Sequence, residues 1–369
     1  MNRRNFIISG LAAAALARQS FAAVKSASPL EVAVTSPWLT NGAAVSSQGT
    51  IFINLPRFKG HENSPALAKV TAHGPVPFPG NDWNQWRAGA SGVDQLVNIN
   101  AVHIFNDHLV WVVDQGAPED GTPAPGAAKL VAFDIATGRV SKILRFDAQS
   151  LPPGGAPNDL RIWGDLIFVT DSGLGGIIIH NLKTGVTKRK LSALPELKKP
   201  PKLAQKGFGG RILSDEKGKR PEVASDMLEV SPDGKWLYFS TPTGPMRHIA
   251  TRYLLDDALD DATLQGHIEK YADIPSIGGT AMDSQGHFYL SNTESRSVER
   301  LLPGGERQVL IQDDRLISAD ALFIDRSRNI YIPAPQLEYL PSSNQGVNKT
   351  AAPWFIYKFP LPSERARWR

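Results

Sequence analysis

Short apolar runs recur along the chain in pairs, each pair joined by a tight turn. Six segments share this pattern: a polar residue or glycine, four or five strand-forming residues, a turn, and a strand rich in Val, Ile, Phe, Trp and Tyr. Runs of this length with SQG, GD, PDG or SRN turns are typical of buried β-hairpins. The segments are NGAAVSSQGTIFIN from Asn41, NAVHIFNDHLVWVVD from Asn100, NDLRIWGDLIFVTD from Asn158, DMLEVSPDGKWLYFST from Asp226, GTAMDSQGHFYLSN after Gly278 and DALFIDRSRNIYIPA from Asp320.

The spacing of these segments predicts an all-β fold, a six-bladed β-propeller. Successive segments begin 59, 58, 68, 52 and 42 residues apart, and a four-stranded blade needs about 40–50 residues. Residues 129–146 and 176–191 each form a second strand–turn–strand pair. Helical periodicity is weak, with one short candidate around 254–265 in a loop. A pair of β-sandwiches is the structural alternative, but it gives no reason for six similar units.

Two further strands are predicted outside the six segments, at residues 30–36 and 354–359. An open ring would leave unpaired strand edges. We therefore expect these two strands to join the first and last blades and to close the ring, so that residues 23–369 form one propeller domain.

The first 22 residues have the composition of an export signal. Arg3 and Arg4 precede an apolar stretch that is too short to span a bilayer, and the segment ends in small residues around Ala22. The paired arginines resemble a bacterial twin-arginine signal, which implies the export machinery as a partner and a periplasmic or secreted protein. A retained membrane anchor is the alternative. Beyond this segment we expect no membrane span.

Composition and charge exclude several classes of function. The 369 residues include no cysteine, which excludes disulfides, thiolate metal sites, iron–sulfur clusters and cysteine nucleophiles. Removing residues 1–22 takes away three arginines and no acid, so the formal net charge falls from +4 to +1. A nucleic-acid partner therefore loses its main support.

Equivalent positions of the six units place polar residues at one mouth of the predicted channel. The first strand of a blade lines the channel, and the second strand returns to the same face. The polar ring is expected to bind a small molecule, an ammonium group or a hard cation such as Ca²⁺; the alternative is that these residues only cap strand ends. The first-strand positions are Asn41, Asn100, Asn158, Asp226, Gly278 and Asp320, and the second-strand positions are Asp114, Asp171, Thr241 and Asn292.

Three other features are weaker candidates. His103 lies in a first strand and either points into the channel or packs in the core. The aromatic and proline-rich residues 74–86 could form a lid or pack as a surface loop. Residues 195–222, with eight Lys/Arg and four Asp/Glu, have the composition of a solvated insertion.

The sequence resembles the major royal jelly protein/yellow family over nearly the whole mature chain. The similar pieces occur in the family's order and include FINLPRFKG (52–60), PFPGNDWN (77–84), LVWVVDQG (109–116), KLVAFDIATG (129–138), IFVTDSGLGGIIIHNLKTG (167–185), DMLEVSPDGKWLYFSTPTG (226–244), GGTAMDSQGHFYLSN (278–292) and DDRLISADALFID (313–325). The resemblance implies a secreted six-bladed propeller with a ligand-binding channel. Some members bind biogenic amines, and some yellow proteins are linked to dopachrome conversion. Insect members carry cysteines, so this chain resembles a bacterial-type relative, and no agreed catalytic set can be carried over.

A more distant resemblance is to gluconolactonase-like propellers, which hold a divalent cation with a Glu, an Asn and an Asp from channel strands. Asn158 and Asp226 match the Asn and the Asp. The Glu is missing, because the first unit offers only Asn41. A missing anionic ligand weakens a site for a hard cation, so this resemblance ranks second.

Three functional hypotheses follow. The first is an exported binder of a small aromatic or cationic metabolite that needs no cofactor; as an isomerase of dopachrome type, it would use Asp226 and Asp320 as the acid–base pair. The second is a metal-dependent lactone hydrolase. The third is a non-catalytic propeller that binds a protein partner.

Overall fold

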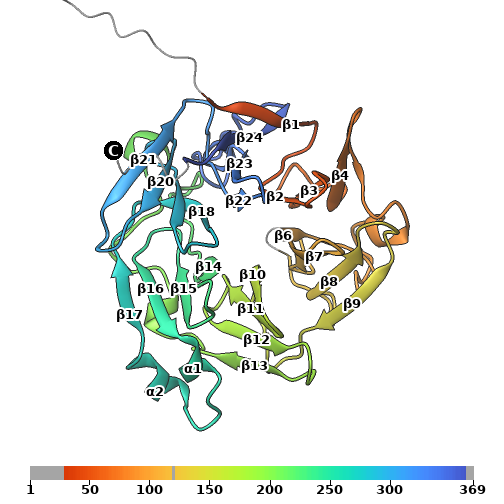
Figure 1. Ribbon diagram of the computed structural model, residues 1–369. Helices are drawn as coiled ribbons and strands as arrows, with labels where there is room; N and C mark the ends of the chain where they lie inside the picture. The colour runs from red at the N-terminus through yellow and green to blue at the C-terminus, as the bar shows by residue number, and fades with distance from the viewer. Residues whose placement is uncertain (1–28, 119–120, 363–369) are drawn as a thin grey trace, which may run out of the picture.

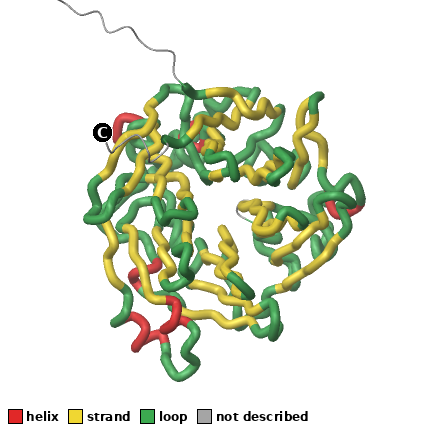
Figure 2. Tube along the Cα trace, viewed as in Figure 1, coloured by secondary structure: helices red, strands yellow, loops and turns green. Residues whose placement is uncertain are grey.

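Six four-stranded antiparallel sheets surround a central axis in the computed structural model, which describes residues 29–118 and 121–362 (Figure 1). The predicted six-bladed β-propeller is therefore confirmed. Each predicted segment supplies the first two strands of one blade, and the third and fourth strands lie farther from the axis. Loops connect the strands at both faces of the ring (Figure 2).

Consecutive strands form the first five blades. Blade 1 contains β2 (Gly42–Val45), β3 (Ile51–Asn54), β4 (Leu67–Thr71) and β5 (Gly74–Pro77); blade 2 contains β6 (Ile99–Asn106), β7 (Leu109–Asp114), β8 (Lys129–Asp134) and β9 (Val140–Arg145); blade 3 contains β10 (Pro157–Trp163), β11 (Leu166–Asp171), β12 (Ile177–Asn181) and β13 (Thr187–Lys190); blade 4 contains β14 (Met227–Val230), β15 (Trp236–Ser240), β16 (Met246–Ala250) and β17 (Glu269–Ala272); blade 5 contains β18 (Ile277–Met282), β19 (Phe288–Asn292), β20 (Ser297–Leu301) and β21 (Arg307–Gln312). The short helices α1 (Thr251–Leu254) and α2 (Asp261–Gln265) lie between β16 and β17, where the sequence predicted one short helix.

The core lies between neighbouring blades, which explains the continuous apolar runs of the inner strands. In β7, Val110 and Val112 pack toward blade 1, whereas Trp111 and Val113 pack toward blade 3. Successive side chains of a strand point to opposite faces of the sheet. Both faces are covered here, so neither set of positions can be polar.

The two terminal strands close the ring within a single blade. Blade 6 has the order β22 (Phe323–Ile324), β23 (Asn329–Ala334), β24 (Trp354–Pro360) and β1 (Glu31–Ser36). The N-terminal strand β1 is thus the outer strand of the last blade, and it pairs antiparallel with β24. This confirms closure by the termini, with the C-terminal strand in the third position instead of at an edge. No covalent link is needed, because the hydrogen-bonded pair joins the two ends of the chain.

The predicted export signal at residues 1–22 lies outside the described residues. Within residues 29–118 and 121–362, the helices are all too short to cross a bilayer.

Closure by β1 can be tested with two valines of that strand. Val34 is 2% exposed and pairs with Ile356, whereas Val32 is 49% exposed. Val34→Asp buries an unpaired charge in the closing strand, and we expect it to lower the free energy of unfolding by about 3 kcal/mol or more. Val32→Asp, the matched control, should change it by less than about 0.5 kcal/mol. Equal urea midpoints for the two variants would contradict closure through β1.

Candidate functional site

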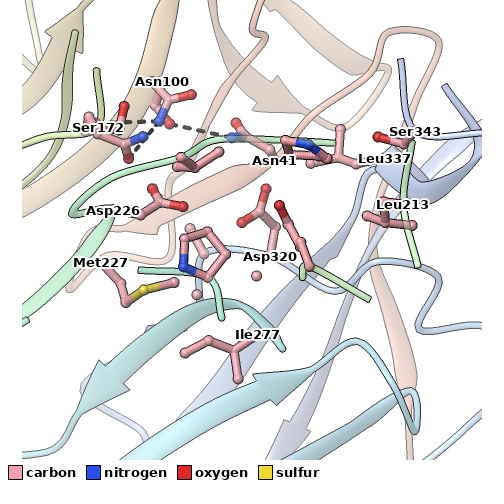
Figure 3. Close-up of a pocket in the computed structure, with 18 of the residues that line it drawn as sticks. Asn41, Asn100, Ser172, Leu213, Asp226, Met227, Ile277, Asp320, Leu337 and Ser343 are labelled. Carbon is pink, nitrogen blue, oxygen red and sulfur yellow. Dashed lines mark hydrogen bonds between the residues drawn. The ribbon is translucent and has the colours of Figure 1, made fainter. Parts of the chain in front are cut away.

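The six blade starts meet at one cavity of about 590 Å³ on the axis of the ring. The residues that the repeat predicted for the first-strand position all line it: Asn41, Asn100, Asn158, Asp226, Gly278 and Asp320. Asp226 and Asp320 lie on either side of the same space, with Asn41 and Asn100 beside them (Figure 3).

Irregular backbone at the starts of three first strands aims these residues at the axis. The pairing of β6 with β7 shifts register between Ile99 and Ala101, that of β10 with β11 between Pro157 and Leu160, and that of β18 with β19 between Ile277 and Thr280. Each shift falls on the predicted position. A bulge turns a side chain away from the regular pleat, so these residues face the channel mouth.

Glycine is required at the blade 5 position because blade 6 lies against it. A Cβ atom on Gly278 would collide with the carbonyl oxygen of Ala319, and one on Gly279 would meet Ala321. These glycines leave room for the backbone that carries Asp320. Gly278, the one blade start without a polar side chain, therefore makes room for the segment that carries the Asp320 carboxylate.

Asparagine amides connect the first three blades in one direction. Asn54 Nδ2 donates to Asn41 Oδ1 at 2.5 Å and to the carbonyl oxygen of Asn100 at 3.0 Å. Asn100 Nδ2 donates to Asn158 Oδ1 at 2.8 Å, and Figure 3 shows Asn100 beside Asn41. The side chain of Asn158 in turn hydrogen-bonds Asp226, and that of Asn41 hydrogen-bonds Asp320. The amide oxygens of Asn41 and Asn158 are thus already used as acceptors, and their N–H groups remain for the carboxylates.

The two carboxylates hold their protons unusually strongly. Burial, reinforced by the charge of Asp159, raises the pKa of Asp226 to about 7. Burial and the nearby Asp226 raise the pKa of Asp320 well above its ordinary value. Each side chain is only partly buried because it keeps an edge on the cavity. Hydrogen bonds from Asn158 and Asn41 oppose these shifts but do not cancel them. Both carboxyls therefore ionise at a higher pH than an ordinary aspartate does.

A buried network of ion pairs lies along the first strands that extend from the cavity. Arg161 donates to both oxygens of Glu229 at 2.9 and 2.7 Å and to Asp159 Oδ2 at 2.8 Å. His103 Nε2 lies 2.8 Å from Asp159 Oδ1, and Thr280 donates to Glu229 at 2.8 Å. The network crosses blades 2 to 5. His103 thus lies inside a polar network, with its ring stacked on Phe105.

The network keeps one of its carboxylates ionised beside the cavity. Burial disfavours the ionised form of Asp159, but the neighbouring Arg161 and His103 outweigh burial and lower the pKa of Asp159 to about 2. Asp159 lines the cavity, so its charge repels a second negative charge on Asp226. Sequence analysis missed Asp159, Arg161 and Glu229, although the signal was present: they are charged residues within otherwise apolar first strands.

The four second-strand positions are not among the lining residues. Asp114 is fully buried, pairs with Lys129 at 2.8 Å and accepts from the backbone N–H of Val97 and Asn98. Asp171 pairs with Arg189 at 2.7 Å. The side chains of Thr241 and Asn292 bond to Thr243 and Glu299 respectively. These contacts fasten loops and outer strands, as the strand-capping alternative proposed.

Two long loops form the cavity walls. Residues 191–226, between β13 and β14, contribute Gln205, Leu213, Asp215 and 219–223, and residues 335–353, between β23 and β24, contribute Leu337, Leu340, Ser342 and Ser343. Glu338, which is 3% exposed, joins them by accepting from the backbone N–H of Phe208 at 3.0 Å and from Arg211. Residues 195–222 are therefore a cavity wall and not simply a solvated insertion.

The aromatic segment 74–86 does not reach the cavity. It contains β5 and the single-turn helix Asp82–Asn84, and its Phe78 and Trp83 pack edge-on against Phe133. Its large side chains thus cover blades 1 and 2, as the surface-packing alternative proposed.

The residues present do not fit a calcium ion. Ca²⁺ takes six to eight oxygen ligands, whereas the mouth offers the carboxylates of Asp226 and Asp320 beside amide oxygens already in use. The carboxylate of Asp159 also lines the cavity, but its oxygens already bond to Arg161 and His103. In the part of the chain that the structure describes, no three His, Asp or Glu side chains gather in a metal-binding cluster. The first blade supplies Asn41 where a gluconolactonase-like site has a Glu.

The raised pKa of Asp226 predicts how stability depends on pH. The folded chain binds more protons than the unfolded chain between about pH 4 and pH 7, so the free energy of unfolding falls as pH rises through that range. Asp226→Asn should therefore raise the free energy of unfolding by about 1–3 kcal/mol at pH 8 and change it little at pH 4. Asp165→Asn is the control, because Asp165 is exposed and its carboxylate has no ion-pair partner in the described part of the chain. A less stable Asp226→Asn protein at pH 8 would contradict this account.

Solved structures share the fold at low sequence identity. A gluconolactonase from Xanthomonas campestris is 15% identical, with 90% of this chain and 89% of that one covered and a TM-score of 0.54. The calcium-binding protein regucalcin from Agrobacterium tumefaciens is 13% identical, with 89% and 94% covered and a TM-score of 0.51. The chain spans only 40% of the extracellular domain of a one-component system from B. thetaiotaomicron, at a TM-score of 0.46.

Family membership comes from the sequence. No curated protein matches the chain. The sequence model of the major royal jelly protein family matches residues 100–351, which is more than half of the chain and includes four of the five polar blade starts. The chain therefore belongs to the major royal jelly protein family.

Proposed function

We propose that this protein binds a small organic cation in the cavity at the mouth of the channel. The observation that carries the proposal is the Asp226–Asp320 pair, two carboxylates that face one cavity. Among residues 29–118 and 121–362, neither has an ion-pair partner. A ligand ammonium group would supply the missing positive charge.

The electrostatics favour a cation over a neutral ligand. The pKa values of both carboxyls are raised chiefly by burial and then by neighbouring negative charge. A cation within about 4 Å favours the ionised form of a carboxyl, so ligand binding and ionisation of the pair assist each other. Charge-assisted hydrogen bonds to an ammonium group are also about twice as strong as neutral ones.

The apolar side chains in the cavity walls suit a ligand whose ammonium group is attached to an apolar group. Phe58, Leu213, Val223 and Leu340 line the cavity together with the carboxylates. A volume of about 590 Å³ falls within the roughly 300–1,000 Å³ of small-molecule sites. An amine on an aromatic ring would place the ring against these side chains and the ammonium group against the acids.

Benzylamine binding tests the proposal by calorimetry. Asp226→Asn and Asp320→Asn should each weaken binding at least tenfold, because each removes a charge that the ammonium group needs. Affinity should fall as pH drops from 8 to 5, since Asp226, with a pKa of about 7, becomes protonated.

Asp257→Asn is the matched control, because it removes a carboxylate of equal charge from an exposed loop and should leave benzylamine affinity unchanged. Equal affinity of all three variants and the parent would overturn the proposal.

Proton transfer is a second candidate function of the same pair. Asp226, with a pKa of about 7, and Asp320, whose pKa is also raised by burial, supply a pair of carboxyls for base and acid roles. In an isomerase of dopachrome type, one carboxyl would remove a proton from the substrate and the other would return one. This candidate is supported by the family and by the acid–base pair.

Dopachrome turnover by the purified protein tests the isomerase. Asp226→Asn and Asp320→Asn should each lower the rate by about 10²-fold or more, whereas the Asp257→Asn control should retain it. Turnover that is the same in both site variants as in the parent would remove the acid–base assignment. Lactone hydrolysis receives less support, because the mouth lacks the Glu that such a metal site uses.

A further inference from the structure

We propose that the ligand of the cavity is a zwitterion, with an ammonium group at Asp226 and Asp320 and a carboxylate at Lys219 and Arg220. This inference rests on the proposed function and adds the class of ligand. It comes from the distribution of charge around the cavity. Asp226 and Asp320 lie at the blade starts, and Lys219 and Arg220 lie on the loop that forms a wall of the same cavity, together with Asp215 and Glu222.

The two cations lack acidic partners in the described part of the chain. Of the three acids nearest in sequence, Asp215 and Glu222 bond to other groups, and Glu216, among the described residues, forms no ion pair with either cation. Asp215 Oδ1 accepts the backbone N–H of Lys217 and of Lys219, both at 2.8 Å, and Glu222 pairs with Lys199 at 3.3 Å. Lys219 and Arg220 are therefore available to an anion in the cavity.

The loop holds the backbone that carries these cations in a defined place, while the side chains of Lys219 and Arg220 are exposed. The backbone N–H of Asp215 donates to Lys219 at 2.9 Å, which closes a tight turn. Ser214 forms a bridge to Asn344 and accepts from the N–H of Gln345 at 2.8 Å, so the turn is attached to the facing wall. A side chain on an anchored backbone loses less freedom on binding than one on a mobile segment.

The chain leads directly from the cations to the acids. Residues 219–223 line the cavity, and β14 begins just after Asp226. Arg220 and Asp226 are six positions apart in the sequence, and an extended segment of that length spans at most about 20 Å. Apolar wall residues such as Val223 and Leu340 line the same cavity. The geometry therefore suits a small molecule with opposite charges at the two ends of an apolar body.

Ligands with a single charge would fit this cavity less well. An amine alone would leave Lys219 and Arg220 without an anion, and an acid alone would be repelled by the ionised carboxylates. A zwitterion satisfies both groups. The orientation is also fixed, because reversing the molecule would set like charges together.

Three probes of one shape test this inference by calorimetry. 4-(Aminomethyl)benzoate carries both charges at opposite ends of a ring, benzylamine lacks the carboxylate, and 4-methylbenzoate lacks the ammonium group. We expect the zwitterion to bind about five- to tenfold more tightly than benzylamine, as one partly exposed charge pair allows. 4-Methylbenzoate should bind most weakly.

The double variant Lys219→Met/Arg220→Gln should abolish the advantage of the zwitterion without weakening benzylamine binding. The control Lys183→Met/Arg139→Gln makes the same charge change on exposed residues outside the cavity and should retain the advantage. Equal affinity of the parent for the zwitterion and benzylamine, or an advantage that survives in the double variant, would overturn the inference while cation binding stands. Failure of both amines to bind would overturn the proposed function itself, and the inference with it.

Discussion

Two carboxylates held close together in a partly desolvated channel mouth are the constraint on which the site depends. Asp226 and Asp320 belong to blades 4 and 6. A negative charge in this mouth raises the free energy needed to ionise a neighbouring carboxyl group. Burial supplies most of both pKa shifts. The negative charge of Asp159 adds to the shift of Asp226, and the charge of Asp226 adds to that of Asp320. Without a ligand, such a pair weakens the fold as pH rises. A site with such unfavourable negative charge gains affinity for a cation, because the bound cation neutralises part of that charge.

The propeller supplies the rigidity that keeps the pair together. Six first strands converge on the axis, and the β1–β24 pair prevents the ring from opening. Gly278 lets the segment that carries Asp320 approach blade 5 closely. The Arg161 network holds the first strands of blades 3 and 4 with two-point contacts. It also keeps Asp159 ionised, so the network sets the electrostatic environment of the mouth as well as its shape.

Repeat alignment predicted the fold and the first-strand residues well, because both depend on local pattern. Strand length, turn residues and spacing determine a blade, and equivalent positions of equivalent blades must meet at the axis. The second-strand positions, such as Asp114 and Asp171, have the same polar chemistry but lie one strand farther out, where buried Lys129 and Arg189 neutralise them. Residue type alone could not distinguish the first-strand positions, which line the cavity, from the second-strand positions, which do not. Nor could it show that residues 191–226 wall the cavity, because contacts such as Phe208 with Glu338 join segments 130 residues apart.

A direct titration of the aspartate carboxyls tests the central claim, that this pair lacks positive charge in the ligand-free protein. Carbon-13 NMR of carboxyl-labelled aspartate, with Asp226→Asn and Asp320→Asn for assignment, would follow both groups from pH 3 to pH 9. The account predicts that the Asp226 carboxyl titrates near pH 7 and that the Asp320 pKa is also clearly raised. Ordinary titration of both carboxyls, near pH 4, would contradict it.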